Sequence, residues 1–237
     1  MNQLEVDEII KKLEKLSKPE ELEGMKRFGI NPENTYGIRM PVLKKIAKEY
    51  KNNHELAMDL WKIDTRETRI IASLVDVPEM VSPEQMDKWA DEFSYWELCD
   101  QCCINLFRKT EHAYDKIIEW TESEKEFVKR AGFALIAVLA VHDKKQNDQT
   151  FIDLLKLVKR EARDERNFVK KAVNWALRQI GKRNNVLNKE AIATAYEIDK
   201  IDSISAHWIA KDALRELTSE KVKIAIEKKE KKLKKLK

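Results

Sequence analysis

Two side chains near the middle of the sequence, Trp96 and Asp100, could act on one substrate. They are four residues apart within residues 94–100, and this spacing places them on one face of a helix. An indole ring presents an electron-rich face to a cation, and a carboxylate stabilises positive charge that develops in a transition state. The pair is therefore a candidate for chemistry on a group that becomes positively charged.

Two later segments add cations and a second tryptophan. Residues 127–131 and 168–172 have nearly identical sequences that contain Arg130 and Lys171, and Trp175 follows the second segment. An aromatic surface, one carboxylate and several cations predict an active site. The residue types alone leave another interpretation open, in which the tryptophan belongs to the core and the aspartate to a solvated helix surface.

The elements that position these residues are predicted to be helices. Only five glycines and five prolines occur in 237 residues, and a hydrophobic share of 43% with six tryptophans indicates a folded chain. Helix-start patterns, in which a capping side chain precedes a proline or an acidic residue, occur at residues 17–20, 64–67 and 82–84. No stretch alternates apolar and polar residues as a strand does, so the predicted fold class is all-α.

The helix openings repeat along the chain. Arg130 and Lys171 are 41 residues apart, and Lys171 and Lys211, which lies in a similar opening, are 40 residues apart. Two helices with their turns fill about 40 residues in HEAT-type repeats. The sequence therefore predicts a superhelical α-solenoid of HEAT-like helix pairs, in which equivalent helices line a concave, DNA-binding face.

Equivalent positions in such repeats lie on the same side of the solenoid. Arg69, Arg130, Lys171 and Lys211 would then form a basic row, and a curved row of cations suits a phosphate backbone. The alternative is a solvated helix face whose cations pair with glutamates of the same chain. The sequence leaves both interpretations open.

The net charge of +4 is unevenly distributed along the chain. Residues 221–237 contain nine lysines and two glutamates, which give this segment a charge of +7 and the rest of the chain about −3. We predict one domain over residues 1–220 and a lysine-rich tail over residues 221–237. The tail is either a solvated helix end or an arm that contacts nucleic acid.

The longest apolar run indicates where the protein is located, and the cysteines indicate whether it binds a metal. The longest apolar run, residues 131–141, is far shorter than the roughly 20 residues of a membrane-spanning helix, so we expect a cytoplasmic monomer that contacts no membrane. The three cysteines are Cys99, Cys102 and Cys103. Their spacing lacks the second pair or the histidine that would complete a zinc site, so we predict buried helical thiols, no metal and no cofactor.

Four parts of the sequence together carry a family resemblance. They are residues 25–28 with 36–41, residues 95–100, residues 127–131 and residues 170–178. In this order and spacing, from about Lys26 to Leu217, the chain resembles the AlkD-like DNA alkylation repair glycosylases of bacteria and archaea, which are built from HEAT-like repeats. The resemblance implies a DNA repair glycosylase that hydrolyses the N-glycosidic bond of cationic alkylated purines, 3-methyladenine and 7-methylguanine, in double-stranded DNA.

The resemblance also implies roles for individual residues. Asp100 is the catalytic carboxylate, Trp96 and Trp175 hold the sugar and backbone of the lesion, and Arg130 holds a phosphate. Phe28 stands where the family can have tyrosine, so the ring is kept and the hydroxyl is missing. The residues expected to contact DNA are Phe28, Arg69, Lys129, Arg130, Lys170, Lys171, Arg178 and Lys211.

The implied chemistry suits these residue types. A methylated purine that carries a positive charge leaves with little help from an acid, so the remaining barrier is the oxocarbenium character of the sugar. A single carboxylate at Asp100 can stabilise that cation and position the attacking water. No lysine is marked out as a Schiff-base nucleophile, so a monofunctional enzyme is expected, and the family is thought to approach the lesion from the DNA backbone.

Two other functions remain open at this point. A catalytically silent repeat protein that binds damaged or branched DNA would not need Asp100, because the charge of this carboxylate repels phosphate. A protein-interaction scaffold is a common use of HEAT arrays. Cations at successive repeat positions count against the scaffold.

Overall fold

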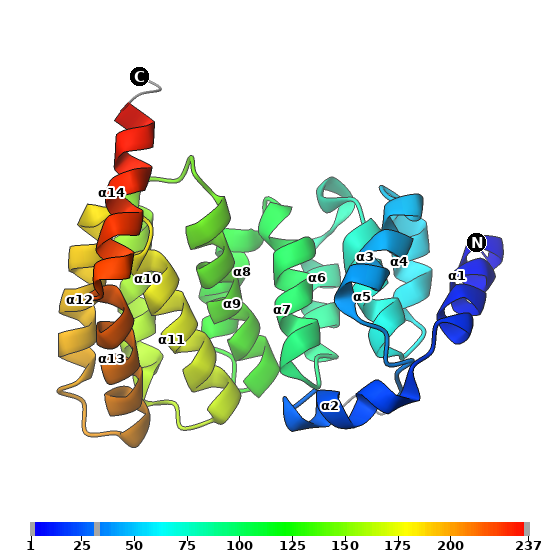
Figure 1. Ribbon diagram of the computed structural model, residues 1–237, viewed down its shortest axis with the longest axis horizontal. Helices are drawn as coiled ribbons and strands as arrows, with labels where there is room; N and C mark the ends of the chain where they lie inside the picture. Colours follow the sequence, from blue (N-terminus) through cyan, green and yellow to red (C-terminus); the bar gives the residue numbers. More distant parts are fainter. Residues whose placement is uncertain (1–2, 31–33, 235–237) are drawn as a thin grey trace. The chain divides into compact units, whose positions relative to one another are not determined.

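The computed structural model describes residues 3–30 and 34–234, and all the regular secondary structure within them is helical (Figure 1). The predicted all-α class is confirmed. The chain divides into two compact units, residues 1–115 and residues 116–237. No helix among the described residues is long and apolar enough to cross a membrane.

The first unit contains seven α-helices among its described residues. They are α1 (Gln3–Lys15), α2 (Leu22–Arg27), α3 (Met40–Ala47), α4 (His54–Trp61), α5 (Arg66–Val75), α6 (Pro83–Asp91) and α7 (Trp96–Asn105). Helix α5 packs against α3, α4 and α7. The rings of Trp61 on α4 and Trp89 on α6 are stacked with their centres 3.9 Å apart, so the core continues from one helix pair to the next.

A helix begins at each of the three predicted starts in this unit, and two of these starts are capped by a side chain. Thr65 caps α5 by accepting a hydrogen bond from the backbone of Thr68, and Ser82 caps α6 in the same way with a proline in the first turn. The cap predicted at Ser17 is wrong. Its hydroxyl instead donates to the backbone oxygen of Tyr36, and the 3-10 helix Pro19–Glu21, which continues directly into α2, begins without a side-chain cap.

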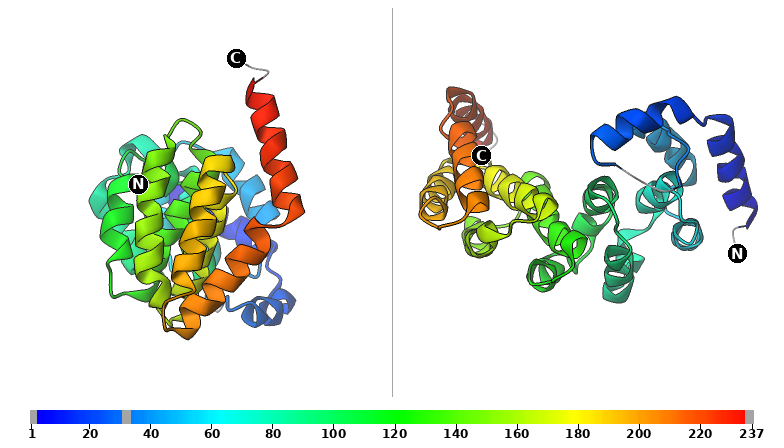
Figure 2. Two further views of the ribbon diagram at one scale, coloured as in Figure 1. Left: turned by 90° about the vertical axis from the view of Figure 1, so that its left-hand side faces the viewer. Right: turned by 90° about the horizontal axis from the view of Figure 1, so that it is seen from below.

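The second unit is a succession of helix pairs. Its helices are α8 (Ala113–Thr121), which crosses the unit boundary, α9 (Glu126–His142), α10 (Asp148–Arg160), α11 (Asn167–Gly181), α12 (Asn185–Ile198), α13 (Ile204–Leu217) and α14 (Glu220–Lys234). Helix α11 packs between α9 and α13, and α10 packs beside α12, as Figure 2 shows from two sides. The unit therefore has two layers, with the second helix of each pair in one of them.

Close helix packing in this unit depends on two glycines. A Cβ atom at Gly132 of α9 would lie 2.9 Å from the backbone nitrogen of Thr121 at the end of α8. A Cβ atom at Gly181 of α11 would lie 2.7 Å from a methyl group of Leu217. Both distances are too short for real contacts, so these positions allow the helices to approach each other only because they lack a side chain.

The repeat is less regular than the sequence spacing predicts. Helices α9 and α11 begin 41 residues apart, but α13 begins only 37 residues after α11. Arg130 and Lys171 therefore each lie four residues after the first residue of their helix, whereas Lys211 lies seven residues after the first residue of α13. The position in α13 that matches Arg130 and Lys171 is Trp208.

The lysine-rich segment begins as an ordered helix. Val222 and Ile226 of α14 are buried, the ammonium group of Lys229 donates to the backbone oxygen of Lys182 at 2.8 Å, and Glu230 accepts hydrogen bonds from Asn185. The start predicted for the tail thus coincides with the start of a helix that packs on the second unit. Residues 235–237 of the predicted tail lie outside the described residues.

Candidate functional site

Trp96 and Asp100 lie on α7 as the spacing predicts. Trp96 is the first residue of the helix and Asp100 follows one turn later. Asp100 is 7% exposed, and because a carboxylate away from bulk water acts on a nearby cation more strongly than an exposed one does, its location favours an electrostatic role. The indole nitrogen of Trp96 donates a hydrogen bond to the backbone oxygen of Phe28 at 2.8 Å, which fixes the ring against the end of α2.

Phe28 contributes a surface ring beside this pair. Its side chain is 75% exposed, although the residue ends α2 and holds Trp96 through its backbone oxygen. Any residue type could supply that backbone contact. The ring itself is therefore available for stacking or packing on a ligand, which is the role that survives the absence of a tyrosine hydroxyl.

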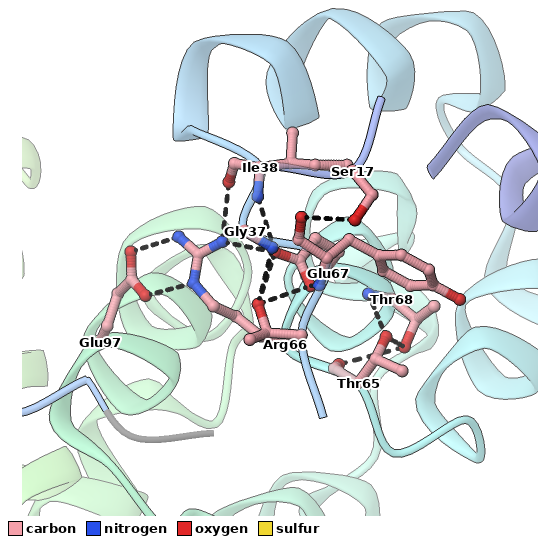
Figure 3. A network of polar contacts seen from close by, with 10 residues as sticks. Ser17, Gly37, Ile38, Thr65, Arg66, Glu67, Thr68 and Glu97 are labelled. Carbon is pink, nitrogen blue, oxygen red and sulfur yellow. Dashed lines mark hydrogen bonds and ion pairs between the residues drawn. The ribbon is translucent and has the colours of Figure 1, made fainter. Parts of the chain in front are cut away.

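A buried ionic network fixes the start of α7 (Figure 3). The guanidinium group of Arg66 donates to both carboxylate oxygens of Glu97, at 2.7 and 2.8 Å, and to the backbone oxygen of Ile38. Glu97 directly follows Trp96. Burial acts to lower the pKa of Arg66, but the ion pairs with Glu97 and Glu67 outweigh it and raise the pKa above its ordinary value, so the network is held together by charge.

Glu67 extends the network to the segment before α3. Its carboxylate accepts hydrogen bonds from the backbone nitrogens of Tyr36 and Ile38 and from the hydroxyl of Thr35. These contacts direct Glu67 away from the start of its own helix, although a glutamate three residues after Asp64 is typical of a capping box. Sequence reasoning missed Arg66, Glu67 and Glu97 as supports of the site. The signal was three charged residues in the first turns of α5 and α7, whose side chains are mostly buried.

The three cysteines of the sequence all lie on α7. Cys99, Cys102 and Cys103 are fully buried, which confirms the predicted buried thiols. Burial raises the pKa of Cys102 and of Cys103 well above the ordinary value. Both groups therefore remain thiols at neutral pH and contribute apolar packing to the core around α7.

A second group of predicted residues lies along α11. Lys171, Trp175 and Arg178 follow one another at spacings of four and three residues, and Lys182, which sequence reasoning missed, continues the pattern at a spacing of four. These spacings place all four on one face of the helix. We call them the α11 stripe. It extends over about 16 Å along the helix axis, since each residue adds 1.5 Å.

Glu216 of α13 holds the C-terminal half of the α11 stripe. Its carboxylate pairs with Arg178 and with Lys182, each at 2.8 Å. Burial raises the pKa of Glu216, but the hydrogen bonds and charges of Lys182 and Arg178 outweigh this and lower it overall. The Nε atom of Arg178 is buried, lies 3.7 Å from Asp212, and has no hydrogen-bond partner within the described residues. One donor of this arginine thus remains to be satisfied.

Three predicted DNA contacts are engaged within the fold. Arg130 is 6% exposed and donates to the backbone oxygen of Phe168 at 2.7 Å, which joins α9 to the start of α11. Lys129, also buried, pairs with Glu161 at 2.6 Å. Arg69 pairs with Glu92 and Asp64 and lies over the ring of Trp61. These contacts give the three cations a structural role, and a DNA contact for them remains a prediction.

One of the other cations predicted in the second unit lies near an aromatic ring that sequence reasoning missed. The ammonium group of Lys170 lies 5.6 Å from the centre of the Trp208 ring, which is 39% exposed. Lys171 and Lys211 are exposed. The predicted row contains Arg69, Arg130, Lys171 and Lys211, and its members differ in their surroundings. The first two contact other residues of the protein, and the last two are exposed to solvent.

The structure therefore assembles the predicted residues as two groups. Phe28, Trp96 and Asp100 belong to the first unit, and the α11 stripe with Lys170, Trp208 and Lys211 belongs to the second. The first group offers a carboxylate beside aromatic rings. The second offers cations beside aromatic rings, the combination that binds a phosphate backbone and its bases.

Comparisons with known proteins show the fold and the family of the chain. The chain is 24% identical over 199 residues to the uncharacterized protein Lin0241 of Listeria innocua, which covers 82% of this chain and 87% of that protein. A solved structure described as "a new family of proteins related to the HEAT-like repeat DNA glycosylases with affinity for branched DNA structures" matches with a TM-score of 0.73 at 22% identity, over 88% of this chain and 94% of that one. This match shows the HEAT-like repeat fold. Residues 9–228 match the model of the DNA alkylation repair enzyme family, and the chain belongs to that family.

Proposed function

We propose that the protein is a monofunctional DNA glycosylase that releases cationic alkylpurines, 3-methyladenine and 7-methylguanine, from double-stranded DNA. The observation that carries the proposal is the pair on α7, where Asp100 is nearly buried one turn from an indole ring that a hydrogen bond to Phe28 holds in place. A family of DNA alkylation repair enzymes matches most of the chain, which supports the choice of DNA as substrate.

The proposed reaction needs one carboxylate. The bond between the sugar C1′ atom and the base nitrogen breaks with its electrons passing to the cationic base, which leaves as a neutral molecule. Positive charge then develops on the sugar, where Asp100 stabilises it and the face of Trp96 adds about 0.5 to 2 kcal/mol. Water adds to C1′ and gives up its proton to Asp100, which completes hydrolysis.

DNA binding is proposed to depend on the second unit. Lys171, Arg178 and Lys182 of the α11 stripe would contact phosphates, and Trp175 would offer a flat apolar surface between them. Lys211 extends these contacts to α13. The protein is proposed to act as a monomer without a metal or cofactor. Its selectivity for alkylated purines is proposed to come from the reactivity of the cationic lesion.

The test is base release from methylated duplex DNA by the purified protein, measured by chromatography of the free bases. We expect release of 3-methyladenine and 7-methylguanine by the parent protein and by an Asp153→Asn control, which changes the same functional group on an exposed position of α10. Release should be strongly reduced in Asp100→Asn. Equal release by all three proteins would remove Asp100 from the reaction.

A second candidate function is binding without catalysis. One observation favours it, because the solved structure with a TM-score of 0.73 is described as having affinity for branched DNA structures. In this case the parent protein would release no base and would bind a four-way junction more tightly than a duplex of equal length. Measuring both quantities on the same preparation separates the two candidates.

A further inference from the structure

Four cations meet at the end of α11 that lies away from Lys171. They come from three segments: Lys144 from the loop after α9, Lys182 and Arg183 from the two residues directly after α11, and Lys229 from α14. We call them the α14 cluster. None of the four is among the DNA contacts predicted from the sequence, because they come from segments that are up to 85 residues apart along the chain.

Arg183 is fixed in this cluster by neutral partners. Its guanidinium group donates to the backbone oxygens of Ala140 and Gln146, at 3.1 and 2.9 Å. It also lies over the ring of Phe151, 4.4 Å from the ring centre. These contacts hold the side chain in place, but no carboxylate among the described residues forms an ion pair with it.

The lysines of the cluster have few counter-charges. Lys229 donates to the backbone oxygen of Lys182, and Lys144 has no ion pair within residues 3–30 and 34–234. Burial lowers the pKa of Lys229, and the charges of Lys144, Lys182 and Arg183 lower it further. Burial and the charge of Arg183 lower the pKa of Lys144. Neighbouring positive charges thus remain mutually repulsive, and a bound anion would relieve this repulsion.

Space for an anion exists beside the cluster. A pocket of about 270 Å³ lies between α14 and the ends of α11 and α13, and its lining includes Lys182, Lys221, Lys229 and Glu216. Liquid water occupies about 30 Å³ per molecule, so a phosphate group fits there together with several waters. Glu216 reduces the positive charge on one side of the pocket only, where it pairs with Lys182.

We infer that the α14 cluster binds a phosphate of the DNA backbone, so that the DNA contact continues from the α11 stripe onto α14. Lys182 belongs to both sets of residues, which makes the two contacts continuous. The inference rests on the DNA binding in the proposed function. It also assigns a role to the lysine-rich segment, which contributes an anchored lysine rather than a loose charged arm.

The test compares two double variants that remove the same charge from neighbouring positions. Lys144→Ala with Lys229→Ala removes two members of the cluster, whereas Lys145→Ala with Lys228→Ala removes the two lysines that directly adjoin them, and all four side chains are exposed. Affinity for unmodified duplex DNA is measured at several salt concentrations. For the cluster variant we expect the slope of log affinity against log salt to become shallower by roughly 0.9 for each phosphate that the protein no longer neutralises, and we expect the control variant to keep the parent slope.

The outcomes separate the possible explanations. Equal slopes in the two double variants would overturn the inference, since only the general positive field would then matter. If inorganic phosphate, added at constant ionic strength, binds the parent but not the cluster variant and does not compete with DNA, the cluster is an anion site separate from the DNA contact and the inference also fails. Absence of DNA binding by the parent protein would contradict the proposed function as well.

Discussion

The indole nitrogen of Trp96 donates a hydrogen bond to the backbone oxygen of Phe28 across a separation of 68 residues. This contact joins α2 to the first residue of α7, one turn before Asp100. The orientation of the tryptophan ring therefore depends on the position of α2, while the exposed ring of Phe28 is not needed for that purpose. The role of the Phe28 backbone oxygen and the role of its ring can therefore be tested with different variants.

Trp96→Phe should slow base release by about five- to tenfold, because it keeps an aromatic face and removes the hydrogen bond that orients it, worth about 1 kcal/mol. Phe28→Ala keeps the backbone oxygen, so it should leave the Trp96 contact intact and weaken DNA binding by about tenfold through removal of a stacking surface. Phe28→Tyr should bind DNA as the parent does. Single-turnover rates and binding constants distinguish the three variants, and a slower chemical step in Phe28→Ala would show that the ring also positions Trp96.

Asp100→Asn should lower the rate of base release by about 100-fold or more, since removing one preorganised charged group typically costs that much. DNA affinity should stay equal or increase, because the carboxylate opposes phosphate binding. Single-turnover release and equilibrium binding, measured on the same preparation, check both statements. A variant that also fails to bind DNA would point to a folding defect, which circular dichroism would reveal.

Local and distant interactions differ in how far the sequence predicts them. The shared helix face of Trp96 and Asp100 and the cap at Ser82 follow from spacings within one or two turns. Whether a cation is available to DNA depends on partners in other helices. Arg130 contacts a backbone oxygen 38 residues away, and Arg69 contacts a carboxylate 23 residues away. Neither partner can be identified from periodicity, so the predicted row included both cations.

The same limit applies to the repeat length and to the network around Arg66. The early start of α13 reflects an α11 that is shorter than α9 and shorter connections before and after α12, which move Lys211 away from the position that matches Lys171. The ion pair between Arg66 and Glu97 spans 31 residues. Helix propensity carries no information about such a pair, because both residue types are equally compatible with an exposed helix start.

Glu97→Gln should destabilise the first unit, because it leaves Arg66 buried with only Glu67 as a charged partner. Breaking a buried ion pair from one side costs about 3 to 5 kcal/mol, and the remaining pair with Glu67 places the expected destabilisation near the lower limit. Chemical denaturation measures this change in the free energy of unfolding. The matched control is Glu197→Gln, whose partner Lys159 is exposed as Glu197 itself is, and this variant should change stability by less than about 1 kcal/mol.

Arg130→Ala and Lys171→Ala should act differently on DNA binding and on stability. Arg130 is engaged with the backbone of Phe168, so its removal should destabilise the protein and leave the salt dependence of DNA binding unchanged. Lys171 is exposed on the α11 stripe, so its removal should make the slope shallower by roughly 0.9 and leave stability unchanged. A shallower slope for Arg130→Ala would show that its guanidinium group leaves Phe168 when DNA binds.

Glu216→Gln should strengthen DNA binding, because it removes a negative charge from Arg178 and Lys182 while keeping a side chain of the same size. Binding of duplex DNA at low salt measures the gain, which should be about fivefold for roughly 1 kcal/mol of relieved repulsion. Glu197→Gln is the matched control, since Glu197 pairs with Lys159 in the other helix layer and should have no effect. A similar gain in both variants would reflect net charge alone.

The effect of Glu216→Gln should also depend on pH in a definite direction. The pKa of Glu216 is lowered overall by Lys182 and Arg178, despite the opposing effect of burial, so the parent carboxylate is charged throughout the neutral range and the gain in affinity should be constant there. As the pH falls through this pKa, which lies below the ordinary value of a glutamate, the parent residue becomes neutral and the two proteins should converge. A gain that disappears already between about pH 6 and 7 would show that another group, of higher pKa, controls Arg178 and Lys182.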